Sequence, residues 1–569
     1  MNLGFNMKAY KLQKLNLILF SFIISVSLYS QDIDSIFRVR GEKYFGFVLT
    51  SEMRPDDFTN MFSIDGAKGD TIIANAGLEQ FKKFLELGIP YFFLSHPSEQ
   101  IDFEAVNIHH LNQHTNWDFY PDYDSYLEIM SDFSVNYPEI CQIHEIGTLV
   151  SGRKLLAARI SKNVGSESDK PRFLYTATIH GDELTGYVLS LQLIDHLLTN
   201  YGTDAYITRL VDSIDIWINP LANPDGTFHF GNNTINGAKR YNSQNIDLNR
   251  NYPDPEAGPH PDNKPWQEET VFFMDFAESM KFNMSANWHG GAEVCNYPWD
   301  TWYELSADNP WWVYTMREFA DTVISRSPSP YFRSFDNGIV RGSMWYSITG
   351  GRQDYMNYFQ GCREFTLELS NNKIPPPNRL PLYWEYNYPS FLNYIEQSLY
   401  GVRGIVRDSI SNEPLRAKVF ITNHDIDSSF VYSHLPAGDY HRYLYEGSYN
   451  IVFSAPGHNS KTFYNVNVGK RRTTWLNVEL SPVEDGIGAE NNSLNIRIYP
   501  NPVTEGSLFI SSERKPGFIE LINSAGIRVF NDYSEETEIC LDTSELASGL
   551  YLIRIHNGKG YITKKIIIF

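Results

Sequence analysis

Between residues 117 and 398, short apolar runs alternate with longer segments whose apolar residues recur at helical spacing. The run at 173–179 predicts a buried strand, and the segment at 183–198 predicts a helix. Further strands are predicted at 214–218, 283–288 and 365–369. Alternation of this kind indicates an α/β domain with a largely parallel central sheet, because parallel strands are joined by crossovers that are usually helical.

Different patterns flank this domain on both sides. Residues 31–112 combine strand-like runs with a helix-like stretch at 77–87, which predicts a small α+β region, either a pro-segment or an independent cap. After Tyr400, short alternating strands and turn residues take over. The remaining predictions are a β-sandwich at 401–480, a polar linker at 481–492 and a second small β-domain at 493–569.

The N-terminus has the composition of an export signal. Lys8, Lys11 and Lys14 precede an apolar run at 15–28. This arrangement predicts a signal peptide over residues 1–30, and an uncleaved anchor helix is the alternative. The run is short for a membrane span, which favours the signal peptide.

The net charge argues against a nucleic-acid partner, and the cysteine spacing argues against a cysteine zinc site. The formal net charge of −21 disfavours nucleic acid as a partner, and solubility alone also accounts for it. The four cysteines, at 141, 295, 362 and 540, form no CxxC pair, which argues against a cysteine zinc site.

The first candidate site is His180-Gly181-Asp182-Glu183, which lies where a predicted strand gives way to a helix. A histidine and a carboxylate three positions apart across such a turn can point at one ion, and zinc accepts both ligand types. Alone the motif is weak, because an N-capping Asp182 and a first-turn Glu183 also explain it. A second strand ends at His289, which would complete a His₂Glu set; a core histidine is the alternative.

Two further segments carry groups suited to hydrolysis. Arg240 and the string at 247–251 are rich in donors that could bind a carboxylate or an oxyanion, or could simply form a solvated loop. Glu368 lies in an alternating strand, on the face opposite Phe365 and Leu367. It could accept a proton as general base, or it could face solvent from an edge strand.

Taken together, these motifs resemble those of the zinc metallocarboxypeptidase family, and most closely its regulatory branch of carboxypeptidases D, N and E. The strings are HGDE at 180, NPDG at 223, RYNSQNIDLNRN at 240, SANWHGG at 285, WYSITGGRQDY at 345 and EFTLELS at 364. The resemblance implies a carboxypeptidase fold with a mixed, largely parallel sheet at 117–398. It also implies a transthyretin-like sandwich at 401–480.

The resemblance also implies a role for each matching residue. Zinc would be held by His180, Glu183 and His289, with Glu368 as general base and Arg240 stabilising the oxyanion. Asn249, Arg250 and Tyr346 would bind the terminal carboxylate of a peptide or protein substrate. Asp247 would orient a zinc-bound histidine.

Specificity follows from the same resemblance. In the regulatory branch, an aspartate eleven residues after the third zinc ligand favours a basic C-terminal side chain, and here that residue is Asp300. Gln353 matches a glutamine of the same pocket. Arg352 replaces a methionine common in relatives, and we expect it to point away from the pocket. The implied reaction is release of C-terminal Lys or Arg.

The tail resembles the C-terminal sorting domain of the type IX secretion system. The matching strings include Tyr499-Pro500-Asn501-Pro502 and Ser548-Gly549-Leu550-Tyr551. This implies recognition by secretion machinery and a secreted or outer-membrane cell-surface protein; an ordinary accessory sandwich is the alternative. Two other functions remain open: a zinc peptidase trimming cell-wall peptides, and an inactive peptide-binding homologue.

Overall fold

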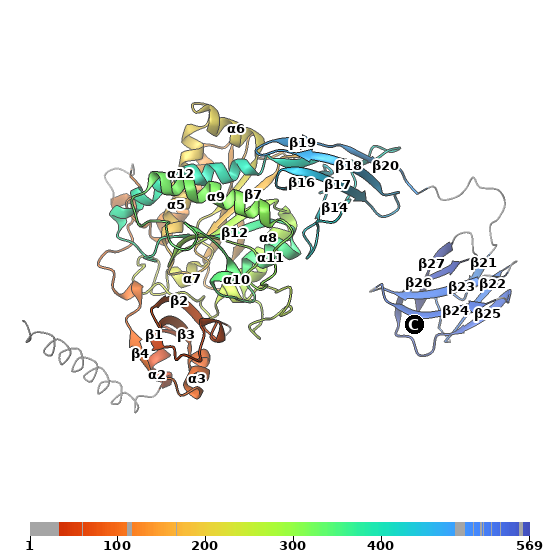
Figure 1. Ribbon diagram of the computed structural model, residues 1–569, viewed down its shortest axis with the longest axis horizontal. Coiled ribbons are helices and arrows are strands. Elements are labelled where there is room, and N and C mark those ends of the chain that lie inside the picture. The colour runs from red at the N-terminus through yellow and green to blue at the C-terminus, as the bar shows by residue number, and fades with distance from the viewer. Residues whose placement is uncertain are drawn as a thin grey trace, which may run out of the picture. The chain divides into compact units, whose positions relative to one another are not determined.

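The computed structural model describes residues 33–569 except 60, 111–115, 167, 484–495, 505, 513–514, 516, 525, 535 and 557–560. The predicted signal peptide and most of the predicted linker lie outside the described residues. The chain divides into two compact units, Met1–Val483 and Glu484–Phe569, which we describe separately (Figure 1). Within the described part of the chain, no helix has the length and apolarity to cross a membrane.

An eight-stranded mixed sheet forms the centre of the first unit, with strand order β11-β10-β12-β9-β7-β8-β6-β5. Its strands are β5 (Cys141–Thr148), β6 (Lys154–Ile160), β7 (Arg172–Ala177), β8 (Asp215–Asn219), β9 (Met284–His289), β10 (Glu293–Tyr297), β11 (Ile339–Arg341) and β12 (Arg363–Leu369). The four neighbours β12, β9, β7 and β8 run parallel, and β10 pairs parallel with β11. The predicted mixed, largely parallel sheet is therefore confirmed.

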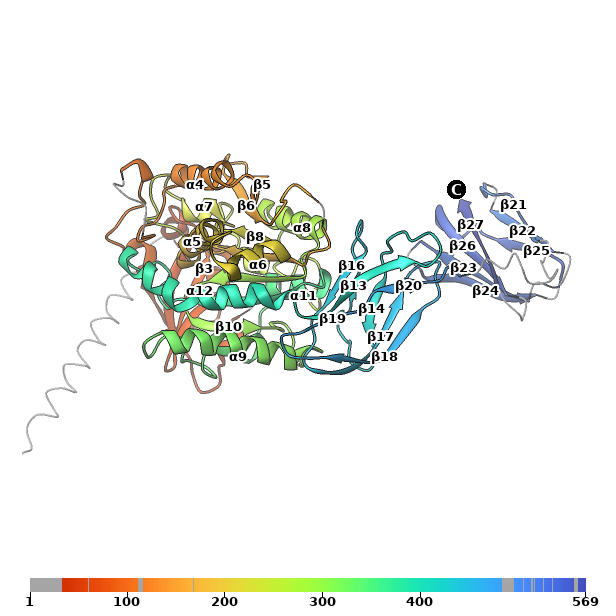
Figure 2. The ribbon, with the colours of Figure 1, turned by 90° about the horizontal axis from the view of Figure 1, so that it is seen from above.

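Helices cover both faces of this sheet, as parallel sheets require. One face packs against α4 (Tyr123–Asn136), α5 (Thr185–Asn200), α9 (Asn309–Arg326) and α12 (Leu380–Gln397), and the other against α8 (Glu268–Met280) and α11 (Arg352–Phe359). Figure 2 shows α9 and α12 running side by side. The shorter helices are α6 (Ala205–Ser213), α7 (Pro224–Thr227) and α10 (Gly342–Trp345). Phe365, Leu367 and Leu369 of β12 enter the larger core, which directs Glu368 to the opposite side of the strand.

The N-terminal region is a four-stranded antiparallel sheet with order β2-β3-β1-β4. Its elements are α2 (Ile33–Phe37), β1 (Glu42–Val48), β2 (Ser63–Lys68), β3 (Thr71–Gly77), α3 (Leu78–Glu86) and β4 (Tyr91–Leu94). Phenylalanines including Phe45, Phe47, Phe81 and Phe84 are fully buried between sheet and helix. The region thus packs helices against a sheet, and β2 reaches the cavity described below.

Residues 401–480 form two four-stranded sheets. Their strands are β13 (Gly401–Asp408), β14 (Lys418–Ile421), β15 (Val431–Tyr432), β16 (Asp439–Arg442), β17 (Gly447–Ser454), β18 (Lys461–Val468), β19 (Thr473–Trp475) and β20 (Val478–Leu480). A buried ion-pair network joins this sandwich to the central domain: Asp308 pairs with Arg442 at 2.8 Å and with Arg363 at 2.7 Å.

The second unit is entirely β in its described residues. It consists of β21 (Ile496–Tyr499), β22 (Ser507–Ser512), β23 (Gly517–Asn523), β24 (Arg528–Ser534), β25 (Glu538–Asp542), β26 (Gly549–His556) and β27 (Tyr561–Ile568). A three-stranded and a four-stranded sheet enclose a core that includes Leu508, Ile519 and Ile553.

Candidate metal centre

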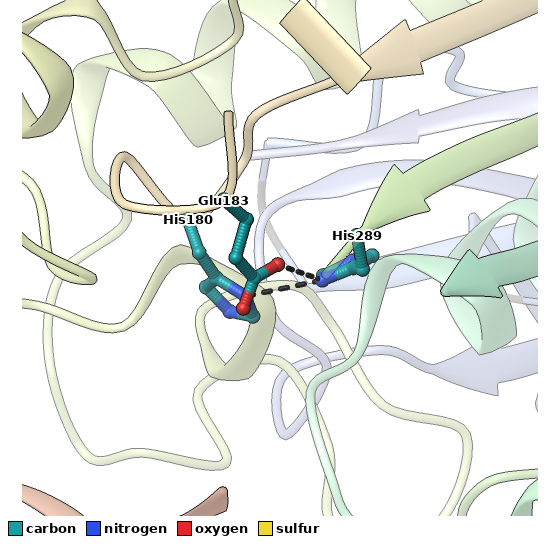
Figure 3. Close-up of side chains that lie close together, drawn as sticks. All are labelled: His180, Glu183 and His289. Atoms are coloured by element: carbon teal, nitrogen blue, oxygen red, sulfur yellow. Dashed lines mark hydrogen bonds and ion pairs between the residues drawn. The ribbon is translucent and has the colours of Figure 1, made fainter. Parts of the chain in front are cut away.

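Three predicted ligands come from the carboxyl ends of two neighbouring strands. His180 follows β7, Glu183 lies just before α5, and His289 is the last residue of β9. Because β7 and β9 are adjacent and parallel, their carboxyl ends open at the same edge of the sheet. Figure 3 shows the three side chains pointing toward one another.

The donor atoms of these side chains converge on one point. Nδ1 of His180 lies 3.0 Å from Oε1 of Glu183, and Nδ1 of His289 lies 2.9 Å from Oε2. The two Nδ1 atoms are 3.1 Å apart, and all three side chains are buried. Two imidazole nitrogens and a carboxylate match a catalytic zinc site, in which a fourth position stays open. The set therefore fits zinc.

A second carboxylate orients one of the histidines. Nε2 of His180 lies 3.2 Å from Oδ1 of Asp247, which leaves Nδ1 free to face the ligand cluster. Burial by itself would raise the pKa of Asp247, but the charges of Arg240 and His180 hold that pKa well below its usual range. Asp247 is therefore anionic, as a carboxylate that orients a ligand must be.

Glu368 stands beside the ligands on the central strand β12. It is the register partner of His289 across the parallel β9–β12 pair. Because β12 lies between β9 and β10, the edge-strand alternative is excluded. Oε2 of Glu368 is buried without a hydrogen-bond partner in the described structure. Burial, with the nearby charge of Glu183, raises the pKa of Glu368 well above its usual range, which suits a proton acceptor.

A single cavity gathers nearly all of the predicted residues. Its free volume is about 50 Å³, room for a few water molecules. The predicted residues on its wall are His180, Glu183, Arg240, Asn249, Arg250, His289, Asp300, Tyr346 and Glu368. Gln353 is not among the lining side chains; its Oε1 accepts a hydrogen bond from the Thr366 backbone at 2.8 Å, and its substrate-binding role stays a prediction.

Local hydrogen bonding places the donor-rich segment at the cavity. The carboxylate of Asp247 accepts the backbone N–H of Asn249 and caps a short turn, Leu248–Arg250. The same carboxylate accepts Nε of Arg240 at 3.0 Å, and NH1 of Arg240 lies 3.5 Å from Glu183. The guanidinium of Arg240 is thereby held next to the metal ligands.

Asp300 provides a buried acid at the cavity wall. Its Oδ1 accepts Nδ2 of Asn296 at 3.0 Å, and burial raises its pKa to about 6. Gly342 makes room for it, since a Cβ there would lie 1.7 Å from Oδ1 of Asp300. Arg352 points away, as expected: its guanidinium pairs with Glu364 at 3.2 Å, and neither residue lines the cavity.

Sequence reasoning missed two charged residues of the cavity. Lys373 is buried with Nζ 2.8 Å from Oδ2 of Asp65 and 3.5 Å from Glu183. Asp65 comes from β2 of the N-terminal domain, and no motif marks it. Lys373 follows the EFTLELS string by three residues, and this closeness in sequence was the only signal that could have pointed to it.

Two family profiles match this chain. The family profile described as Zinc carboxypeptidase matches residues 126–390, and the profile described as Secretion system C-terminal sorting domain matches 497–569. Carboxypeptidase M of Mus musculus is 37% identical over 57% of this chain and 75% of its own length. The carboxypeptidase N catalytic chain of Mus musculus is 31% identical over 63% of this chain and 85% of its own length.

Carboxypeptidase D of Mus musculus is 34% identical over 80% of this chain, and the match spans 33% of that longer protein. Among solved structures, carboxypeptidase A from Helicoverpa armigera is similar with a TM-score of 0.49 at 17% identity. That similarity covers 63% of this chain and 97% of the other.

Proposed function

The chain belongs to the zinc carboxypeptidase family, and we propose that it hydrolyses the C-terminal peptide bond of peptides and proteins and releases Lys or Arg. The observation that carries this proposal is the shared cavity. There the ligand set, Glu368 (whose Oε2 has no hydrogen-bond partner among the described residues) and the buried acid Asp300 line one space. The similar proteins are named carboxypeptidases D, M and N, which supports hydrolysis at the C-terminus of a peptide.

The reaction divides among residues of the cavity wall. Zinc bound by His180, Glu183 and His289 would polarise the scissile carbonyl and activate water. Glu368 accepts the proton of the attacking water and then delivers it to the leaving amine. The guanidinium of Arg240 donates hydrogen bonds to the oxyanion that develops on the carbonyl oxygen.

Exopeptidase selectivity comes from recognition of the free C-terminus. In this proposal Asn249, Arg250 and Tyr346 hold the terminal carboxylate, so that only the last peptide bond reaches Glu368. Arg250 suits this task because a guanidinium binds a carboxylate through two parallel hydrogen bonds.

Selection of the last side chain falls to Asp300. A buried carboxylate forms a strong charge-assisted hydrogen bond with a lysine or arginine head group. When an apolar side chain occupies the pocket, the carboxylate itself is left without a partner, which is unfavourable. The presence of Asp300 therefore favours a peptidase that removes C-terminal Lys or Arg over one that trims cell-wall peptides.

The matched sorting domain at 497–569 indicates secretion. We propose that the protein is exported through the type IX system and is then released or attached at the outer-membrane surface. Fractionation of cells that produce the intact chain or the chain ending at residue 483 tests this. Equal export of both would contradict it.

The activity test uses the purified, zinc-loaded full chain. Peptides that differ only in a final Lys, Arg, Leu or Glu are digested, with amidated versions and muropeptides in parallel, and products are read by mass spectrometry. We expect loss of one C-terminal basic residue and no reaction with amidated peptides. Preferred cleavage of Leu, Glu or muropeptide substrates would contradict the assignment.

A further inference from the structure

The irregular segment 237–241, which carries Arg240, is held by the N-terminal domain. Because this segment belongs to no sheet ladder, its backbone groups need other partners. The carboxylate of Glu42 supplies two: Oε1 accepts the backbone N–H of Arg240 at 3.1 Å, and Oε2 accepts that of Tyr241 at 3.2 Å. Glu42 is 0% exposed, so water does not compete for these bonds.

Neighbouring residues also form hydrogen bonds with the backbone of segment 237–241. Ser98 accepts the backbone N–H of Gly237 at 3.3 Å, and Arg40 donates to the carbonyl of Ala238. Nε of Arg40 also donates to Oε1 of Glu42 at 3.1 Å, which fixes the carboxylate against the segment. Each bond is charged or buried, the class whose loss costs most.

The other side of Arg240 faces the metal ligands. Its carbonyl accepts the backbone N–H of Gly181, next to His180, at 3.2 Å. Its guanidinium contacts Asp247 and Glu183, as described above. The backbone that Glu42 holds is therefore the one that determines where this guanidinium sits.

We propose that Glu42 is a positioning residue for the reaction: it holds the backbone at Arg240 so that the guanidinium meets the developing oxyanion. The inference rests on the proposed function. It reaches beyond the family comparison, because the carboxypeptidase profile begins at residue 126 and leaves the N-terminal domain unmatched. In this proposal the N-terminal domain contributes to the active site by positioning Arg240.

The consequence of losing the Glu42 carboxylate can be stated in kinetic terms. An amide in its place can accept one N–H but turns its NH₂ toward the other, which leaves a buried donor unpaired. Displacement of a catalytic group by about 1 Å costs on the order of 100-fold in rate. We expect Glu42→Gln to lower kcat about 10- to 100-fold. KM should change less than about twofold, because neither Asn249 nor Arg250 forms a hydrogen bond or ion pair with Glu42 in the described structure, so uniform binding is retained.

The test compares Glu42→Gln with Glu79→Gln in the zinc-loaded full chain. Glu79 lies in the same domain with its side chain 72% exposed, so the same chemical change there should leave both constants unaltered. Thermal unfolding of each variant separates a lower kcat from a smaller folded fraction. If Glu42→Gln does not fold, Glu42→Asp, which keeps the charge, takes its place in every comparison.

A binding measurement supplies a readout that does not depend on turnover. In a Glu368→Gln background, one ligand is a peptide ending in Arg, and the other is its phosphinic analogue, whose tetrahedral group resembles the oxyanion. Glu42→Gln should leave peptide affinity unchanged and weaken the analogue by the factor seen in kcat.

Several outcomes would overturn the proposal. These are unchanged analogue binding, a raised KM at constant kcat, or faster hydrolysis in Glu42→Gln. The last result would mean that the N-terminal domain hinders the reaction. If the chain with native Glu42 binds neither ligand, the proposed function itself fails, and the role of Arg240 fails with it.

Discussion

His289 and Glu368 are register partners on the neighbouring parallel strands β9 and β12. One is a metal ligand in the proposed site and the other is the general base. Their separation is therefore set by a backbone hydrogen-bond ladder, which varies much less than a loop does. The arrangement explains how two residues 79 positions apart keep a constant geometry for proton transfer.

Replacement of Glu368 by Gln should remove turnover and keep the metal. A general base contributes roughly 10²- to 10⁴-fold, so kcat should fall by at least about 100-fold. Steady-state kinetics and elemental analysis of the purified variant check this. Glu278→Gln, with a side chain 67% exposed on α8, serves as the control. Retained activity in Glu368→Gln would reject the assignment of the base.

Removal of the metal should abolish activity and lower stability together. Zinc binding to the folded chain stabilises it by about 2.7 kcal/mol at a free concentration 100 times Kd. Chelation should therefore lower Tm, and added zinc should restore both Tm and hydrolysis. His289→Ala should respond to neither treatment, whereas His109→Ala, 69% exposed, should behave like the native chain. A Tm independent of zinc would argue against a resident ion.

Preference for basic residues should depend on pH. Burial raises the pKa of Asp300 to about 6, so the carboxylate is neutral below that pH and charged above it. The ratio of kcat/KM for Arg-ending over Leu-ending peptides should fall as pH drops through about 6. Asp300→Asn should lower the ratio at least about tenfold at neutral pH and remove its pH dependence. A flat ratio in the native chain would exclude Asp300 as the selector.

Gly342→Ala should damage the same pocket indirectly. The new Cβ would overlap Oδ1 of Asp300, so either the carboxylate or the start of α10 must move. Hydrolysis of Arg-ending peptides should slow more than that of Leu-ending peptides. Gly165→Ala provides the control, because its Cβ would meet nothing within 4 Å. Equal effects on the two substrates would mean that Gly342 matters for folding alone.

Much of the site could be predicted from local sequence. His180 and His289 stand at the ends of apolar runs, and the carboxyl ends of parallel strands meet at one edge of a sheet, so these residues and Glu183 could be chosen as candidate ligands. Each motif alone was weak, and only the set of motifs pointed to zinc. Asp300 was found only through the family resemblance, because it lies in no pattern with an independent physical meaning. Arg250 stood out as part of a donor-rich string, but its specific role came from the resemblance. The role of Gln353 rests on the same resemblance and stays a prediction, since its Oε1 accepts the Thr366 backbone N–H and its side chain is not among those that line the cavity.

The sequence by itself determined the order of domains, the strand and helix periods and the ligand motifs, because each is encoded within a few neighbouring residues. Only the tertiary structure decided that the N-terminal domain reaches the site. Glu42 contacts a backbone 198 residues away, and Asp65 reaches Lys373 from β2. These contacts depend on how two separately folded surfaces meet, and the hydrophobic periodicity of the sequence carries no information about that. For the same reason the alternation that placed Glu368 opposite Phe365 could not say which charges would surround it.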